Sequence, residues 1–250
     1  MATPSRLARP PIKEALVDFR TERALPLDPD LLKPLWPAVK DRLPHLEVRN
    51  RMQAHFAASK LGQPPDAKAE DLGFHGLFLK PKDESRFVQF RTDGFTFSQL
   101  SGYTSADDLF AEALDLWDRF VELSRPDKII RVALRFINRL ELGFNEGDDF
   151  DRFLRAAVTT PADTPQTVFE FMTRTVMPLT DGTIAVVTQR LEPKPPGEER
   201  VPFVLDVDVF RMGDFPMTKD GLLPVLQSLR ELKNQLFFAF VTDAALEMYR

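Results

Sequence analysis

The sequence predicts an α+β fold in which one large antiparallel sheet carries two long helices on one face. Three observations lead to this prediction. Segments in which apolar and polar residues alternate outnumber the helical segments, which indicates strands buried on one side only. The two long amphipathic segments follow groups of strands instead of alternating with single strands. The order strand, short helix, three strands, long helix occurs in both halves of the chain.

The first half contains four predicted strands, at residues 14–23, 45–59, 72–82 and 85–100. A short helix is expected within residues 28–43, with Asp28 or Asp30 as its N-cap, and prolines at 34 and 37 shorten or break it. A long helix is expected over residues 104–124, capped by Thr104 or Ser105. Its buried stripe is Leu109, Ala113, Leu116, Phe120 and Leu123.

The second half repeats this order. Its predicted strands are residues 131–142, 167–177, 182–192 and 201–212, with a short helix at 148–158 and a long helix at 218–242 that Thr218 caps. We therefore expect a single α+β domain, residues 1–250, built of two β-α-β-β-β-α pseudo-repeats at about 12–126 and 127–250. The halves should share a sheet of about eight strands. The nearest analogies are TBP-like saddles and helix-grip-like sheets, and such an analogy carries no activity with it.

Composition limits the classes of function. The 250 residues carry a net charge of −5 with a pI near 5.4, so bulk charge does not favour nucleic-acid or anionic-membrane binding. The chain has no cysteine, which excludes disulfides, thiol nucleophiles and thiolate metal sites. The N-terminal residues lack the apolar core of a signal peptide, and no apolar run approaches the ~18 residues of a membrane span. We expect a cytoplasmic protein without membrane contact.

Residues 131–142, "RVALRFINRLEL", place Arg131, Arg135 and Arg139 on one face of a strand. The other face is apolar apart from Asn138, which needs a partner if it is buried. Because long helices cover one side of the sheet, the charged side chains of every strand should share the opposite side. The candidate binding residues are Glu14, Asp18, Arg20, Arg91, Arg131, Arg135, Asn138, Arg139 and Arg174.

Three interpretations of this charged face stay open. It can be a solvated surface on which arginines pair with acids across strands. It can be a concave site for an anion or an acidic partner segment, because the guanidinium fork binds carboxylate and phosphate in a bidentate manner. A saddle for nucleic acid is possible but not favoured, because Asp206 and Asp208 share the face and the chain is acidic.

Signals for catalysis are weak. The three histidines have no metal-ligand spacing, and no phosphate-binding loop or nucleophile motif is present. Asp206 and Asp208 would need a third carboxylate, such as Glu14, Asp18 or Glu170, to hold a divalent metal, and pairing with arginine is the favoured role. We therefore expect no metal and no cofactor. Lys233 and Asn234, on the last long helix, are expected to brace that helix against the sheet.

Three short motifs carry a resemblance to a known family: "PPIKEALVDFR", "LRFINRLEL" and "LRELKNQLFFAFVT". The chain resembles a sporadically distributed family of bacterial proteins with PPIxEA, RYxNR and KNxxF segments, although Phe136 stands where that family has tyrosine. The matching positions are Pro10, Pro11, Ile12, Glu14, Ala15, Arg135, Asn138, Arg139, Lys233 and Asn234. The resemblance implies an accessory role, for example in phage defence or a toxin–antitoxin pair. It also suggests that Glu14 pairs with Arg135 or Arg139.

The resulting hypothesis is a non-enzymatic binding protein that uses the arginine-rich face for a partner protein or an anionic small molecule. One alternative is a metal-dependent enzyme that acts on a phosphorylated or nucleotide substrate. The other is a purely structural subunit. A homodimer formed through an edge strand is also possible, since a free strand edge offers unpaired backbone groups.

Overall fold

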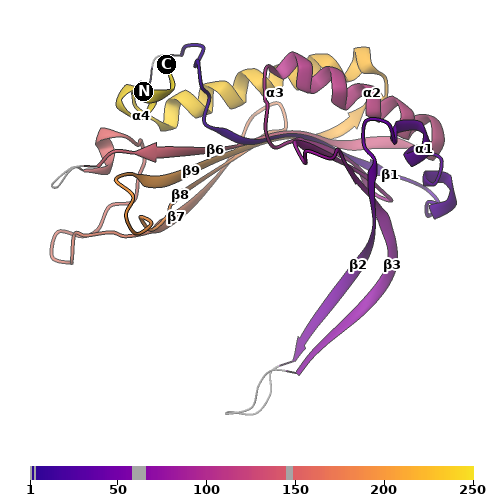
Figure 1. The fold of residues 1–250 in the computed structure, drawn as a ribbon, viewed down its shortest axis with the longest axis horizontal. Coiled ribbons are helices and arrows are strands. Elements are labelled where there is room, and N and C mark those ends of the chain that lie inside the picture. Colours follow the sequence, from indigo (N-terminus) through magenta and orange to yellow (C-terminus); the bar gives the residue numbers. More distant parts are fainter. Residues whose placement is uncertain (1, 3, 58–65, 145–148) are drawn as a thin grey trace.

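The computed structural model describes residues 2, 4–57, 66–144 and 149–250, and for residues 54–57 and 66–69 it describes only the backbone. It confirms the α+β class: one antiparallel sheet with the helices on one face (Figure 1). The sheet has nine strands in the order β2-β3-β4-β5-β1-β6-β9-β8-β7, one more than expected. None of the helices in the described part of the chain is long and apolar enough to span a bilayer.

The strands are β1 (Ile12–Glu22), β2 (His45–Ala57), β3 (Asp66–Lys80), β4 (Arg86–Arg91), β5 (Gly94–Gln99), β6 (Lys128–Leu142), β7 (Phe171–Pro178), β8 (Thr183–Leu191) and β9 (Val201–Phe215). The helices are α1 (Leu35–Val39), α2 (Ala106–Ser124), α3 (Lys219–Phe240) and α4 (Asp243–Leu246). Short 3-10 segments occupy Pro29–Leu32, Phe150–Arg152 and Glu247–Tyr249.

The additional strand comes from residues 85–100, which were expected to form one strand. They form the β4–β5 hairpin, and Thr92 and Asp93 make its two-residue turn. Gly94 follows at φ 152°, and a Cβ there would lie 2.1 Å from the carbonyl oxygen of Phe19 on β1. The hairpin therefore needs glycine at this position. The Asp-Gly pair between two alternating runs is the sequence signal that predicts such a hairpin.

Of the two expected short helices, the first is confirmed and the second is wrong. Residues 28–43 are broken into a 3-10 turn and α1, as the prolines predict, and the side chain of Asp28, not Asp30, caps the first piece. The prediction of a helix at 148–158 is wrong for residues 149–158, the part of this segment that the structure describes. Phe150–Arg152 form a single 3-10 turn, and Leu154 then makes an isolated β-bridge with Val241. Backbone pairing with the chain beyond α3 replaces further helical turns.

The core lies between the sheet and helices α2 and α3. Trp117 of α2 is fully buried against Phe19 and Phe95, and its indole Nε1 donates a hydrogen bond to the carbonyl of Met217 at 2.8 Å. This bond satisfies the one polar atom of a large apolar side chain. The opposite face of the sheet carries no helix, and it is concave between the β2–β3 arm and β7 (Figure 1).

The first strands of the two halves, β1 and β6, are antiparallel neighbours at the middle of the sheet. The flanking strands follow in matching order on each side: β5 and β9, then β4 and β8, then β3 and β7, with β2 in addition. This order agrees with the arrangement expected for two pseudo-repeats. An internal duplication stays a prediction.

Strand β2 differs from the expected pattern. Alternation along the sequence of β2 places Val48 and Met52 opposite Arg49 and Arg51, on the side that helices cover elsewhere in the sheet, but both are exposed. The register of β2 on β3 shifts on both sides of Asn50, and β2 lies at the edge of the sheet. In Figure 1 the outer part of the β2–β3 hairpin extends away from the helices.

Replacing Ser105 with alanine is expected to lower the free energy of unfolding by about 1 kcal/mol. Its hydroxyl oxygen accepts the backbone N–H of Asp108 at 3.1 Å and donates to the Asp108 carboxylate at 2.8 Å, which caps α2. Thr104→Ala is the control, because the Thr104 hydroxyl bonds only the Asp108 side chain. Urea denaturation measures both. Equal losses would contradict Ser105 as the cap.

Candidate functional site

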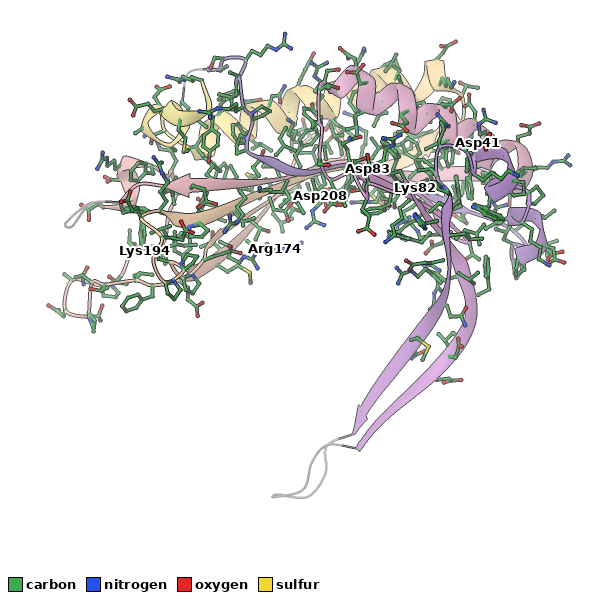
Figure 2. All side chains as sticks on the ribbon, viewed as in Figure 1. Asp41, Lys82, Asp83, Arg174, Lys194 and Asp208 are labelled. Carbon is green, nitrogen blue, oxygen red and sulfur yellow. The ribbon has the colours of Figure 1, made fainter. Side chains whose placement is uncertain are left out.

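The helix-free face is formed by alternate residues of the strands. On β6, Val132, Leu134, Phe136 and Leu140 are buried under the helices, as the alternation predicts. Arg131, Arg135 and Arg139 are half-buried and lie on the other face. Figure 2 shows Asp208 and Arg174 on this same side of the sheet. The helix-free face is therefore lined with charged side chains from several strands.

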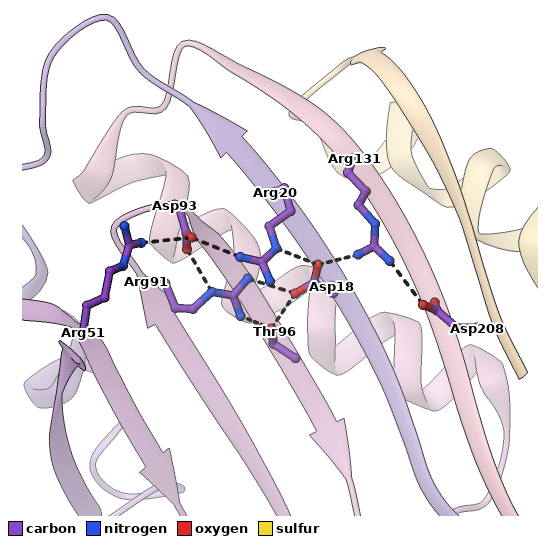
Figure 3. Close-up of polar contacts among 8 residues, drawn as sticks. All are labelled: Asp18, Arg20, Arg51, Arg91, Asp93, Thr96, Arg131 and Asp208. Atoms are coloured by element: carbon purple, nitrogen blue, oxygen red, sulfur yellow. Dashed lines mark hydrogen bonds and ion pairs between the residues drawn. The ribbon is translucent and has the colours of Figure 1, made fainter. Parts of the chain in front are cut away.

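Asp18 of β1 is the centre of an ion-pair network on this face (Figure 3). Its carboxylate accepts hydrogen bonds from Arg91 and Arg131, each at 2.9 Å, and from the Thr96 hydroxyl at 2.7 Å. Arg20 lies 3.4 Å from it. Asp18 is only 7% exposed and Arg91 only 6% exposed. A carboxylate and a guanidinium that are so buried need each other, because an unpaired buried charge is strongly destabilising.

Asp93, in the β4–β5 turn, is a second shared acid. It pairs with Arg20 at 3.0 Å, Arg91 at 3.1 Å and Arg51 at 3.4 Å. Burial alone would raise the pKa of Asp93, but the facing arginines outweigh burial and lower it. The sequence analysis missed Asp93 as a site residue. The Asp-Gly turn signal predicts its turn position, and only the folded sheet places it beside three arginines.

The two aspartates proposed as weak metal ligands bind arginines. Asp206 accepts two hydrogen bonds from Arg135, at 2.8 and 2.5 Å, which is a bidentate pair. Asp208 lies 3.4 Å from Arg131, and burial raises its pKa. Among the described residues, no three histidine or acidic side chains are grouped so that they could hold a metal ion. The geometry required by a metal-dependent enzyme is therefore not found there.

The expected pair between Glu14 and Arg135 or Arg139 is wrong. Glu14 accepts a hydrogen bond from the Ser98 hydroxyl of β5. Arg135 is taken by Asp206, and Arg139 pairs with Glu141 and Glu192. The acids that pair with the two arginines lie on β6 itself or on the β8–β9 side of it, and none lies on β1, the strand on the other side of β6. Glu14 still contributes negative charge near Arg135.

Two of the proposed binding residues lie outside the network. Asn138 is on the core face of β6, where it is buried and donates to the carbonyl of Leu205 at 3.1 Å. Arg174 lies on edge strand β7 and is exposed, and within the described part of the chain it has no ion-pair partner. The candidates that the structure brings together are Asp18, Arg20, Arg91 and Arg131.

Lys233 of α3 packs on the core side of β6. Its ammonium lies 3.8 Å from the centre of the Phe136 ring, and its side chain is buried. Burial lowers the pKa of Lys233 to about 7, and Arg230 adds to the effect. Lys233 thus connects the helix to the arginine strand through a cation–π contact, which supports the expected bracing role. Asn234 next to it is half-buried.

A cavity of about 380 Å³ opens beside the network, between β2, β3 and β4. Arg49, His75, Phe78 and Arg91 line it, together with Asn50 and Gln89. The Arg49 guanidinium lies over the Phe78 ring at 4.8 Å. A second arginine, Arg51, approaches His75 Nδ1 at 3.4 Å. The cavity thus combines an aromatic wall with several hydrogen-bond donors.

His75, which lines this cavity, has a pKa below its ordinary value. Burial lowers the pKa of His75, and three arginines of the network lower it further against the opposing charge of Asp93. Burial by itself disfavours a charge of either sign, so it is the three arginines that favour an anion beside His75, and Asp93 opposes them. No sequence signal marked His75, because its neighbours come from other strands.

The fold and this face together define the class: an α+β protein with a helix-backed antiparallel sheet whose free face is an arginine–carboxylate network. No protein-family model matches the chain, and no curated protein matches it significantly. Membership of the bacterial family that the three motifs resemble therefore stays a prediction.

Proposed function

We propose that the protein is a non-enzymatic binding protein whose helix-free face takes up an anionic group, a phosphate or carboxylate, at the cavity beside Asp93. One observation carries this proposal. In the network of Figure 3, four guanidiniums, from Arg20, Arg51, Arg91 and Arg131, are held by only three carboxylates. An arriving anion would supply the missing acceptor.

The donors that remain available lie on the cavity side. The Arg51 side chain is 51% exposed, and its one carboxylate partner, Asp93, is shared with two other arginines. Each guanidinium has five N–H donors, so Arg51 keeps donors for a ligand while it contacts Asp93. Arg135, one of the candidates from the sequence, is already bound in a bidentate manner by Asp206. The proposal therefore assigns binding to Arg51, with Arg49 as a second donor that lines the cavity and pairs with Glu47 through one nitrogen at 2.7 Å. Arg135 is left as a structural pair.

The resemblance supports an accessory bacterial role, in which the anionic group belongs to a small molecule or to an acidic segment of a partner protein. Nucleic acid is less favoured, because carboxylates interrupt the arginines over the whole face. A purely structural role would require that the extra guanidinium simply faces solvent. The experiment below distinguishes these possibilities.

Thermal melting with pyrophosphate, inorganic phosphate, a glutamate-rich peptide and short DNA and RNA is expected to show stabilisation by at least one of the first three. A probe at 100 times its Kd stabilises the fold by about 2.7 kcal/mol. Arg51→Ala should remove most of this shift. Arg190→Ala is the matched control, because Arg190 lies on the same face with a similar side-chain exposure, 52% against 51%, and lies away from the cavity.

A second readout is the His75 imidazole in an NMR titration. A bound anion should raise the low pKa of His75, because it adds negative charge opposite the arginines that now lower it. If no probe shifts the melting temperature, or if Arg51→Ala and Arg190→Ala respond alike, the cavity is not the site. A response to DNA or RNA alone would replace the proposal with nucleic-acid binding.

A further inference from the structure

Strand β7 is one of the two edges of the sheet, and the other edge is β2. The hairpin that joins β7 to β8 shows which backbone groups of β7 point towards β8. In this hairpin the N–H of Leu179 donates to the carbonyl of Thr183 at 2.8 Å. The β7–β8 register continues without a shift. Because antiparallel strands alternate the side to which backbone groups point, the N–H and C=O groups of Met172, Arg174 and Val176 point away from β8.

These outward groups have no backbone partner among the described residues. Pro178 belongs to the same outward set and has no N–H, so the open edge ends there. The side chains of the edge are also uncovered: Met172 is 70% exposed and Val176 48% exposed. Native proteins normally protect such an edge, and a partner strand is one way to do so.

The edge carries two unused opposite charges. Glu170 and Arg174 are both exposed, and neither has an ion-pair partner in the part of the chain that the structure describes. They are separated by four positions, with Met172 midway between them. Met172 and Arg174 share one face of β7, and Glu170, which directly precedes the strand, joins that face when the strand extends by one residue.

This spacing makes the edge complementary to itself. If two copies of β7 pair antiparallel about a two-fold axis at Met172, each Glu170 lies directly opposite the partner subunit's Arg174. The two Met172 side chains face each other, and Val168 lies opposite the partner subunit's Val176. Opposite charges and apolar residues are thus matched at every pair on that face, which is the arrangement that stabilises antiparallel strands. In this register the two Met172 residues form a hydrogen-bonded pair, which requires that their N–H and C=O groups point outward, as they do.

We propose that β7 is the dimer surface of this protein and that its partner is a second copy of the chain, paired about Met172. A two-fold axis is the commonest symmetry of homo-oligomers and requires such self-complementarity. Residues 168–170 precede β7 and extend the strand in the dimer. The two sheets then continue into one, and the helix-free faces of both copies lie on the same side.

The charges provide a direct test by analytical ultracentrifugation. At roughly 100 μM, where even a micromolar complex is saturated, the wild-type chain should sediment as a dimer. Arg174→Glu or Glu170→Arg alone should weaken the dimer at least about tenfold, because like charges then face each other. The double variant Glu170→Arg with Arg174→Glu should restore it. Lys82→Glu, an exposed site far from β7, controls for the change in net charge.

A cysteine scan tests the register. The chain has no cysteine, so a single introduced thiol can form a disulfide only with its copy. Met172 is the one position of β7 that lies opposite itself, and the expected Cα separation of about 5.5 Å allows a disulfide. Met172→Cys should cross-link at least about tenfold faster than Thr175→Cys, which is equally on β7 and exposed.

A wild-type monomer at this concentration would overturn the proposal. A dimer that Arg174→Glu leaves intact would also overturn it. So would a double variant that stays monomeric, provided that circular dichroism shows the variants to be folded. Equal cross-linking of the two cysteine variants would overturn the register about Met172.

Discussion

Asp18→Ala is expected to lower the free energy of unfolding by about 3–5 kcal/mol, the cost of breaking a buried ion pair from one side. Asp18 is the carboxylate that Arg91 and Arg131 share, and Arg91 is almost completely buried. Without Asp18, the buried guanidinium keeps one carboxylate, Asp93, and its hydrogen bond to the Thr96 hydroxyl. The loss of the hydrogen bond from Thr96 to Asp18 adds to the effect. Denaturation in urea measures the change.

The control for this prediction is Asp206→Ala, which removes the partner of Arg135. The Arg135 side chain is more exposed than that of Arg91, so water replaces the lost acid and the expected cost is about 1 kcal/mol. Combining Asp18→Ala with Arg91→Met should recover part of the lost stability, because the stranded charge is removed as well. A loss of less than about 1 kcal/mol for Asp18→Ala would contradict the role of Asp18 as the centre of the network.

Lys233→Met is expected to act in the opposite direction and raise the free energy of unfolding by about 2–4 kcal/mol at pH 6. Burial lowers the pKa of Lys233 from 10.5 to about 7, and one pKa unit corresponds to about 1.4 kcal/mol. The cation–π contact with the Phe136 ring stabilises the charged form of Lys233 and offsets part of this unfavourable free energy in the wild-type protein. Methionine has a similar length and no charge, so it fills the same space beneath β6.

The pH dependence gives this prediction its sign. Between pH 7 and 10.5 the unfolded chain holds a proton on Lys233 that the native chain has lost. The wild-type protein therefore gains stability from this group as the pH rises through that window, and below pH 7 it carries the full cost. The gain from Lys233→Met should be largest at pH 6 and shrink towards pH 10. Urea denaturation at several pH values measures it.

Lys219→Met is the control for that series, because Lys219 lies on the same helix but is exposed, with a pair to Asp118 at 3.1 Å. Its effect should stay below about 0.5 kcal/mol. If Lys233→Met destabilises the protein at pH 6, or if its gain grows with pH, Lys233 is not held as an unfavourable buried charge.

Local patterns predicted the elements well. The period-two alternation of residues 131–142 gave the correct buried and charged sides of β6, and Thr218 and Ser105 cap the two long helices as expected. The failures came where tertiary contacts override a local pattern. The 148–158 segment has helical spacing, yet its backbone pairs with Val241. The β4–β5 hairpin was missed because its turn has only two residues, Thr92 and Asp93, so that two short strands resemble one long strand despite the Asp-Gly pair.

The site was predicted only in part. The sequence placed Asp18, Arg20, Arg91 and Arg131 on one face, and the structure brings them together. It did not predict that Arg135 forms its ion pair with Asp206, or that Glu14 accepts a hydrogen bond from Ser98. Those partners depend on the register of β1 and β9 against β6, and register shifts such as the one between Ile12 and Glu14 have no local signal. Arg51 comes from β2 and Asp93 from the β4–β5 turn, and they meet only in the folded sheet.

The amino-acid sequence by itself determined which side of each central strand is charged, where the long helices begin, and that those helices share one face of the sheet. The first two are local properties, because side chains alternate along any extended chain and caps act within one turn. The third follows from the order of elements, because each long helix comes after a group of strands. The tertiary structure decided which acid neutralises which arginine, that Asp93 is shared by three of them, and that Glu170 and Arg174 remain unpaired at an open edge. Those outcomes depend on strand order and register, which arise from contacts between residues far apart in the chain.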